Sequence, residues 1–155
     1  MKETRISEYV TIGPQPTTIE EFEVLQFRGF RTIFCLSRKG ELDQVLKPEE
    51  EERLAEDAGI DFVHLPVSLN TLKYDHVDEF VHEVREHEMP TYIHCRIGQR
   101  SAPFALLFHA LRRGMDAERV LMKARELNLK WRAPMITDFM KNYLARAQQQ
   151  PSGLL

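Results

Sequence analysis

Short apolar stretches alternate along the chain with longer stretches in which apolar residues recur at helical spacing. The short stretches have the length and the β-branched or aromatic content of buried strands, and they cover residues 9–12, 32–36, 62–67 and 91–94. Helical segments are predicted to begin near Thr18, Pro48, Tyr74, Ser101, Asp116 and Pro134. This alternation predicts an α/β domain with a central, mostly parallel sheet of four or five strands and helices on both faces.

The first two helical segments begin with recognisable signals. Thr18 stands three residues before Glu21, as in a capping box, and Pro48 precedes an acidic run, Glu49 to Glu52. Such a run suits the dipole of a first helical turn, so we expect it to be solvated and not to bind a metal. The first of these helices is expected to bury the apolar residues Ile19, Phe22, Val24, Leu25 and Phe27.

Composition narrows the classes of partner. The chain has 155 residues, with 21 Lys and Arg against 24 Asp and Glu, so its formal net charge of −3 predicts no nucleic-acid partner. No apolar run approaches the roughly 18–20 residues of a membrane span, and no signal-peptide core follows the start. We expect a cytoplasmic protein with no membrane partner, residues 1–150 forming a single domain and residues 151–155 a frayed tail. The oligomeric state cannot be read from the sequence.

The two cysteines, Cys35 and Cys95, are too few for a disulfide framework. No Cys/His cluster has the spacing of zinc ligands. Neither a metal nor an organic cofactor is therefore expected.

Residues 93–102 carry the chemistry of this chain. The cysteine Cys95 ends a buried strand, a short loop with Gly98 and Arg100 follows, and a helix begins at the end of that loop. In such a turn the loop amides and the helix N-terminus converge on one point that favours an anion. The guanidinium of Arg100 suits a tetrahedral oxyanion, and the positive field should lower the pKa of Cys95. A thiolate facing an oxyanion pocket is equipped to attack phosphorus or sulfur. The alternative, a core cysteine flanked by surface arginines, leaves the glycine and arginine of the turn unexplained.

The order strand, His94, Cys95, Gly98, Arg100, Ser101 and helix resembles the signature loop of cysteine-dependent tyrosine and dual-specificity phosphatases. That loop has five residues between its cysteine and arginine, and this chain has four. The pattern Cys-Arg-x-Gly-x-Arg is similar instead to the smaller loop of rhodanese-type sulfurtransferases.

Flanking stretches extend the resemblance over about residues 5 to 112. Together with the loop, they are similar to a bacterial phosphatase family that is often described as β-lactamase-hydrolase-like, some of whose members are filed as sulfurtransferases. The stretches that carry this resemblance are Tyr9–Gly13, Gly29–Ile33, Gly40–Glu41 and His64–Ser68. The resemblance implies a dual-specificity-phosphatase fold with a shortened loop.

The resemblance also implies roles for the loop residues. Cys95 would be the nucleophile, and Arg100 would hold the oxygens of the transferred group. Ser101 would ease the departure of the sulfur or simply cap the helix. His94 would orient the loop and support the low pKa of the thiol, or be a satisfied core histidine.

The remaining loop residues, Arg96, Ile97, Gly98 and Gln99, are the candidate substrate-binding group. The glycine lets the backbone amides turn toward the anion. The expected substrate is a phosphate ester or another oxyanion, with phosphoproteins among the candidates.

A general acid is the missing part. The related phosphatases place an aspartate shortly after the strand that ends here at Val67, but this chain has no carboxylate there before Asp75. Asp75 is the candidate acid, although an ordinary carboxylate at a helix start explains it as well. The residues Glu41 and Asp43 are weaker candidates. General acid catalysis is typically worth about 10²–10⁴-fold, so its absence would leave a slow enzyme that prefers good leaving groups.

Cys35 ends another predicted strand, and the resemblance allows it to form a reversible disulfide with Cys95. A small core residue is the simpler explanation. Arg38 and Lys39 follow the same strand and are candidates for the rim of the site.

Three functions compete on this evidence. The first is a tyrosine- or dual-specificity-like phosphomonoesterase that forms a thiophosphate on Cys95, which the whole-chain resemblance favours. The second is a sulfurtransferase that carries a persulfide on Cys95, favoured by the loop size, Arg96 and the missing acid. The third is a module that binds an oxyanion or a phosphoprotein with little turnover.

Overall fold

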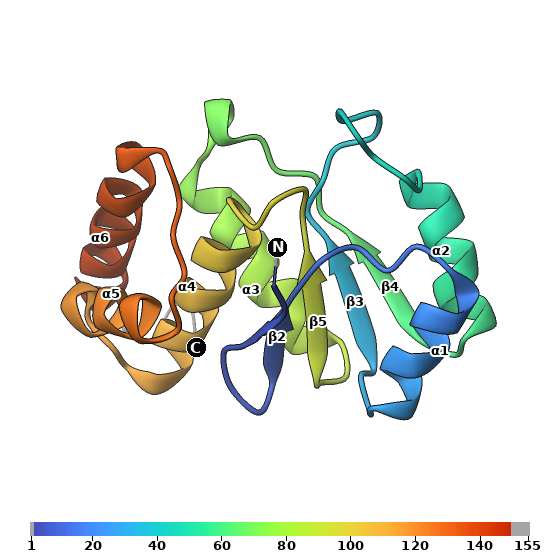
Figure 1. Ribbon diagram of the computed structural model, residues 1–155. Coiled ribbons are helices and arrows are strands. Elements are labelled where there is room, and N and C mark those ends of the chain that lie inside the picture. Colours follow the sequence, from blue (N-terminus) through green and yellow to red (C-terminus); the bar gives the residue numbers. More distant parts are fainter. Residues whose placement is uncertain (1, 150–155) are drawn as a thin grey trace.

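A five-stranded sheet forms the centre of the computed structural model, which describes residues 2–149 (Figure 1). The strands lie in the order β1-β2-β5-β3-β4, with β1 antiparallel to β2 and the other neighbours parallel. Their bounds are β1 Thr4–Arg5, β2 Val10–Ile12, β3 Thr32–Cys35, β4 Asp61–His64 and β5 Thr91–His94. The predicted mostly parallel sheet is confirmed. The edge strand β1 was missed because two residues carry no readable periodicity.

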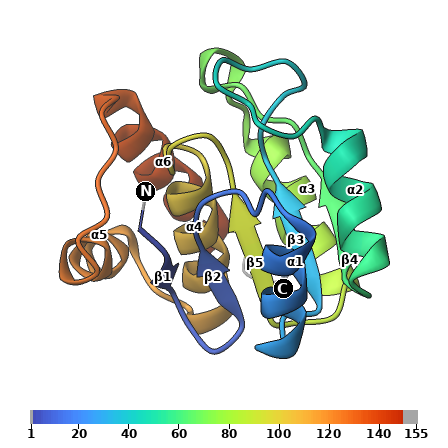
Figure 2. The same ribbon diagram turned by 45° about the vertical axis from the view of Figure 1, so that its right-hand side comes forward.

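Helices cover both faces of the sheet, as predicted. Helices α1 and α2 lie on one face, while α3 and α4 cover the other, with α5 and α6 packed outside them (Figures 1 and 2). Their bounds are α1 Ile19–Phe27, α2 Pro48–Asp57, α3 Tyr74–Glu86, α4 Ser101–Arg113, α5 Ala117–Glu126 and α6 Pro134–Gln149, with a short 3₁₀ turn at Leu69–Thr71. Among the described residues, no helix is long and apolar enough to span a bilayer.

Alternating side chains of the central strands feed two separate apolar layers. Ile33 and Tyr92 pack with α1 and α2, whereas their chain neighbours Phe34 and Ile93 pack with α3 and α4. Successive strand side chains point to opposite faces, so both layers come from the same two strands. A sheet buried on both faces has continuous apolar strands, which is why these segments were readable in the sequence.

The predicted apolar face of α1 is half right. Phe22 and Leu25 are buried, but Val24 is 55% exposed and Phe27 is 89% exposed. Each lies two positions along the helix from a buried residue, which places it on nearly the opposite side of a helix with 3.6 residues per turn. The predicted tail, residues 151–155, lies outside the described residues, and the single domain of residues 1–150 stays a prediction.

Candidate functional site

The carboxyl ends of the parallel strands bring three connecting segments together. Strand β5 runs into Cys95, the segment after β3 carries Glu41, and the segment after β4 carries Ser68. Loop 96–100 then leads into the N-terminus of α4 (Figure 1). Binding crevices of parallel sheets lie at this edge, because the loops that leave neighbouring strands meet there.

The Cys95 thiol sits inside a ring of hydrogen-bond donors. Its Sγ accepts the Gly98 N–H at 3.1 Å and the Ser101 N–H at 3.5 Å, and it lies 3.4 Å from the Ser101 hydroxyl. The Gly98 backbone has a φ of 83°, a left-handed conformation that residues with a Cβ adopt only with strain. The glycine therefore lets the loop turn its amide toward the sulfur.

This ring changes the acidity of the thiol. Burial alone would raise the pKa of Cys95, but the Ser101 hydroxyl, the amides of Ser101 and Arg100 and the Arg100 charge together hold the pKa below its ordinary value. All of these groups stabilise the thiolate over the thiol. The site thus favours the thiolate, which is the nucleophilic form of the sulfur.

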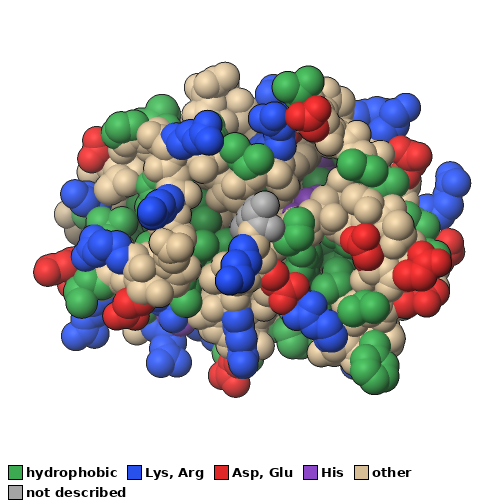
Figure 3. Space-filling view, viewed as in Figure 1, with side chains coloured by type: hydrophobic (Ala, Val, Ile, Leu, Met, Phe, Trp, Pro, Cys, Tyr) green, Lys and Arg blue, Asp and Glu red, His purple; other side chains and the backbone are tan. Residues whose placement is uncertain are grey.

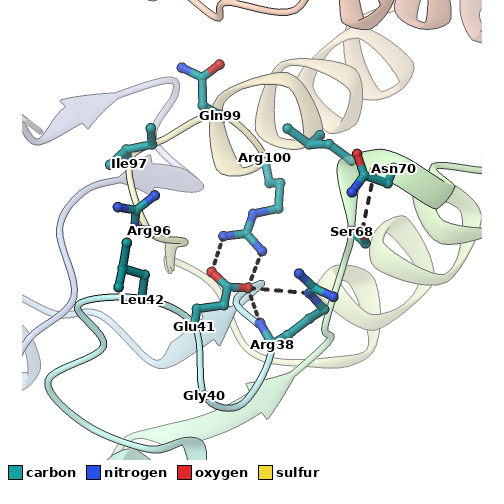
Figure 4. Close-up of a pocket in the computed structure, with 11 residues that line it drawn as sticks. Arg38, Gly40, Glu41, Leu42, Ser68, Asn70, Arg96, Ile97, Gln99 and Arg100 are labelled. Carbon is teal, nitrogen blue, oxygen red and sulfur yellow. Dashed lines mark hydrogen bonds and ion pairs between the residues drawn. The ribbon is translucent and has the colours of Figure 1, made fainter.

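Arg100 is buried and bonded to the two neighbouring connections. Its Nη1 and Nη2 donate to the two carboxylate oxygens of Glu41 at 2.6 and 2.7 Å (Figure 4). The Nη1 group also donates to the carbonyls of Val67 and Leu36 at 2.9 and 3.4 Å. Burial would raise the pKa of Glu41, yet the bonds from Arg100 and from the Arg38 amide hold the pKa below its ordinary value. Glu41 is therefore an anion that fixes Arg100, which makes it a poor proton donor.

A second buried pair lies behind the cysteine. The Nε2 of His94 hydrogen-bonds to the Glu51 carboxylate, whose other oxygen accepts the Gln15 amide at 3.0 Å. Both His94 and Glu51 are fully buried. Burial alone would lower the pKa of His94, but the Glu51 carboxylate raises this pKa to about 10. The prediction of a solvated acidic run is wrong for Glu51, which helix geometry turns onto the buried face of α2 together with Pro48 and Ala55.

The same neighbourhood contains a set of residues able to hold a metal ion. Cys35 Sγ, a Glu51 oxygen and a His94 ring nitrogen lie within 4.8 Å of one another. However, the His94 nitrogen and the Glu51 oxygen bond directly to each other, with no gap for an ion between them. We therefore assign the pair to positioning the end of β5 and do not count these residues as metal ligands.

Two of the cavities next to the signature loop include Arg100 or Cys95 in their lining. The larger of these two has a volume of about 480 Å³ and opens beside Arg100 (Figure 4). Its lining residues are Arg38, Gly40, Glu41, Leu42, Ser68, Leu69, Asn70, Arg96, Ile97, Gln99 and Arg100. The smaller, of about 160 Å³, reaches Cys95 and His94 beneath the segment that carries Glu41 and Asp43. On the face shown in Figure 3, basic side chains are scattered among acidic and apolar ones and form no continuous basic patch.

All of the predicted site residues except one lie around Cys95 or in the lining of the larger cavity. The structure brings His94, Gly98, Arg100 and Ser101 around Cys95, while Arg96, Ile97 and Gln99 line the larger cavity. Asp75 is exposed in the first turn of α3 and is absent from the lining of both cavities. Its role as a general acid stays a prediction.

Sequence reasoning missed the two structural glutamates. Glu41 was considered only as a weaker candidate for the general acid. Its partner Arg100 lies 59 positions away in the sequence. Glu51 does have a signal, because Pro48, Glu51 and Ala55 recur at helical spacing and so share one face. A carboxylate on an inward face needs a buried partner, and that requirement points to the protein interior.

Known proteins with similar sequences point to a phosphatase family. A family model described as DSP-PTPase phosphatase fused to NAD⁺ kinase matches residues 2–140. A beta-lactamase hydrolase-like protein of Agrobacterium fabrum is 33% identical over 111 residues, and one of Xylella fastidiosa is 29% identical over 116 residues. These matches cover 72% and 75% of this chain but only 26% of each relative, so the chain spans about a quarter of their length.

Solved structures share the fold. Tk-PTP in its active form has a TM-score of 0.73 and 20% identity, covering 94% of this chain and 97% of that one. A kinase-associated phosphatase with its catalytic cysteine changed to serine has a TM-score of 0.70 and 20% identity, and the match covers 99% of this chain and 96% of that one. The core catalytic domain of a PP-IP phosphatase from S. cerevisiae has a TM-score of 0.70 and 14% identity, and the match covers 96% of this chain and 91% of that one. The dual-specificity-phosphatase fold expected from the sequence is confirmed.

Proposed function

Since this chain belongs to that DSP-PTPase phosphatase family, we propose that it is a cysteine-dependent phosphomonoesterase that works through a thiophosphate on Cys95. The observation that carries the proposal is the ring of donors around the Cys95 sulfur. It stabilises a thiolate at the point where loop amides and the start of α4 also attract a phosphoryl group.

The chemistry follows from this arrangement. The Cys95 thiolate attacks phosphorus, the bond from phosphorus to the ester oxygen breaks, and the leaving oxygen takes up a proton. Water then attacks the thiophosphate, which releases inorganic phosphate and returns the sulfur. The loop amides and Arg100 stabilise the phosphoryl oxygens in both steps, and the Ser101 hydroxyl assists the departing thiolate. His94, held by Glu51, fixes the strand end that presents the cysteine.

A sulfurtransferase is the second candidate. The four-residue loop with Arg96 directly after Cys95 favours it, as does the lack of a carboxylate in the sequence between Val67 and Asp75. In that reaction the Cys95 thiolate would take a sulfane sulfur from a donor such as thiosulfate, releasing sulfite and forming a persulfide. A binding module with little turnover is the third, since Glu41 already engages the Arg100 fork.

The test compares turnover and trapped intermediates on the wild-type chain. We expect 4-nitrophenyl phosphate to be hydrolysed, with kcat/KM rising as pH increases through the pKa of Cys95, below the ordinary value for cysteine. Acid quenching during turnover should trap a phosphoryl group on Cys95 that intact mass spectrometry detects. Absence of hydrolysis, combined with a persulfide after thiosulfate treatment, would establish the second candidate. Absence of both reactions would leave the binding module.

The proton donor can be located with two leaving groups. Asp43 lines the cavity that reaches Cys95, whereas Asp75 lines neither cavity. We therefore expect Asp43→Asn to slow the hydrolysis of phenyl phosphate, whose leaving group is poor, by about 10²–10⁴-fold. Hydrolysis of 4-nitrophenyl phosphate should change far less, because its leaving group needs no proton. Asp75→Asn is the matched variant, and a larger selective loss there would restore Asp75 as the acid.

A further inference from the structure

We propose that the larger cavity selects phosphate esters carrying a second anionic group, which Arg38 and Arg96 bind, so that the substrate class is small bisphosphates. The inference rests on the proposed function and specifies its substrate. It begins from the charge of the lining. Three arginines, Arg38, Arg96 and Arg100, line one cavity of about 480 Å³, and the only carboxylate among its lining residues is Glu41 (Figure 4).

The single carboxylate does not neutralise this set. Both carboxylate oxygens of Glu41 accept hydrogen bonds from Arg100 at 2.6 and 2.7 Å, so the charge of Glu41 is compensated by Arg100. The Arg38 backbone amide donates to the same carboxylate, but its guanidinium reaches it only through Nε at 3.8 Å, and the side chain is 60% exposed. The Arg38 guanidinium therefore keeps most of its five N–H donors for another acceptor.

Arg96 is available in the same way. Among residues 2–149 its one ion pair is with Asp43 at 3.4 Å, and the two side chains are 42% and 78% exposed. An ion pair this open contributes little, typically about 0–1 kcal/mol, so an incoming phosphate can replace it. A planar guanidinium matches two phosphate oxygens at once. Arg38 follows β3 and Arg96 follows β5, so the two forks approach the cavity from separate segments.

The rest of the lining lacks the surface that an aromatic ester would need. Within the described part of the chain, the cavity is lined by neutral polar and aliphatic side chains beside the charges, and no aromatic ring borders it. A phenyl ring would gain no stacking there. Its volume suits a small molecule, since ligand sites commonly measure about 300–1,000 Å³.

The experiment compares two substrates that differ by one phosphate. Initial rates are measured for fructose 6-phosphate and fructose 1,6-bisphosphate, and 4-nitrophenyl phosphate reports whether the chain is a phosphatase at all. We expect kcat/KM to be about tenfold or more higher for the bisphosphate, an advantage that shrinks as salt is added. The double variant Arg38→Gln with Arg96→Gln should bring the ratio of the two values close to one.

Lys39→Gln is the matched control. Lys39 is an exposed cation next to Arg38, it pairs with Glu49 at 2.8 Å, and it lies outside the cavity lining. Its removal should leave the substrate ratio unchanged, which separates a local site from a general loss of positive charge.

Binding is measured separately, by calorimetry of both sugar phosphates on Cys95→Ser, which does not turn them over. Tighter binding of the bisphosphate, lost in the triple variant with Arg38→Gln and Arg96→Gln, supports the inference. Equal affinity for the two sugar phosphates overturns it, even if 4-nitrophenyl phosphate is hydrolysed. Failure to hydrolyse any of the three esters instead overturns the proposed function.

Discussion

Replacing Cys95 by serine should abolish hydrolysis of 4-nitrophenyl phosphate while leaving the fold intact. A serine hydroxyl does not ionise near neutral pH, so the donors around the sulfur would have no anion to stabilise. Removal of the covalent nucleophile from a serine hydrolase lowers kcat on the order of 10⁶-fold, and we expect a loss on that scale. Steady-state rates measure the loss, and circular dichroism with a urea titration checks the fold.

The other cysteine supplies the matched control. Cys35 is also buried, and Cys35→Ser makes the same chemical change at the end of β3. This variant should keep most of its activity. Equal losses in both variants would contradict a special role for Cys95. Selective alkylation of Cys95 by iodoacetamide at a pH below the ordinary pKa of cysteine, identified by peptide mass, would report its lowered pKa directly.

Replacing Glu51 by alanine should destabilise the protein by about 3–5 kcal/mol, the range for removing one partner of a buried ion pair. His94 would lose the carboxylate that compensates its burial, and the Gln15 amide would lose its acceptor. Urea unfolding monitored by circular dichroism measures the change. Glu52→Ala is the control, because Glu52 is exposed on the same helix and should change the free energy of unfolding by no more than about 0.5 kcal/mol.

The stability of the wild type should also depend on pH through His94. A pKa raised to about 10 in the folded state, against 6.5 for a free histidine, means that the folded protein binds the proton more tightly. The stabilisation is fully present below pH 6.5 and is lost as pH rises through about 10. The difference in the free energy of unfolding between wild type and Glu51→Ala should therefore become smaller as the pH rises from 6.5 to about 10. A difference that stays constant would show that the carboxylate acts through packing alone.

The parts of the fold that could be predicted are those whose signals are local. Strand β5 and the loop after it are continuous in sequence, so the cysteine, the glycine and the helix start were readable together. The helix beginning at Pro48 was predicted correctly for the same reason. Val24 and Phe27 were misplaced because their apolar character does not reveal which side of the helix meets the sheet.

The pairs that brace the site could not be predicted, because their partners are distant in the chain. His94 and Glu51 are separated by 43 positions, and the sequence reveals only that each is a polar residue near an apolar segment. The assignment of a partner requires the sheet order, which places β5 beside β3, and the packing of Ala55 on α2 against Ile33 and Tyr92 of these strands. Asp43 was ranked below Asp75 for a related reason, since a loop in which Asp43 itself has a φ of 62° brings this residue to the lining of the cavity that reaches Cys95.

The bonds of Arg100 decide how the natural substrate should be sought by trapping it from a cell extract. A trapping variant must bind the substrate, stop before turnover and stay folded. Arg100 joins the loop to Glu41 and to the carbonyls of Leu36 and Val67, so its removal would release two connections and leave polar groups unpaired. Bait made by changing Arg100 would lose captured molecules for reasons unrelated to chemistry. Bait made at Cys95 keeps these bonds, and what it retains would report the preference of the pocket itself.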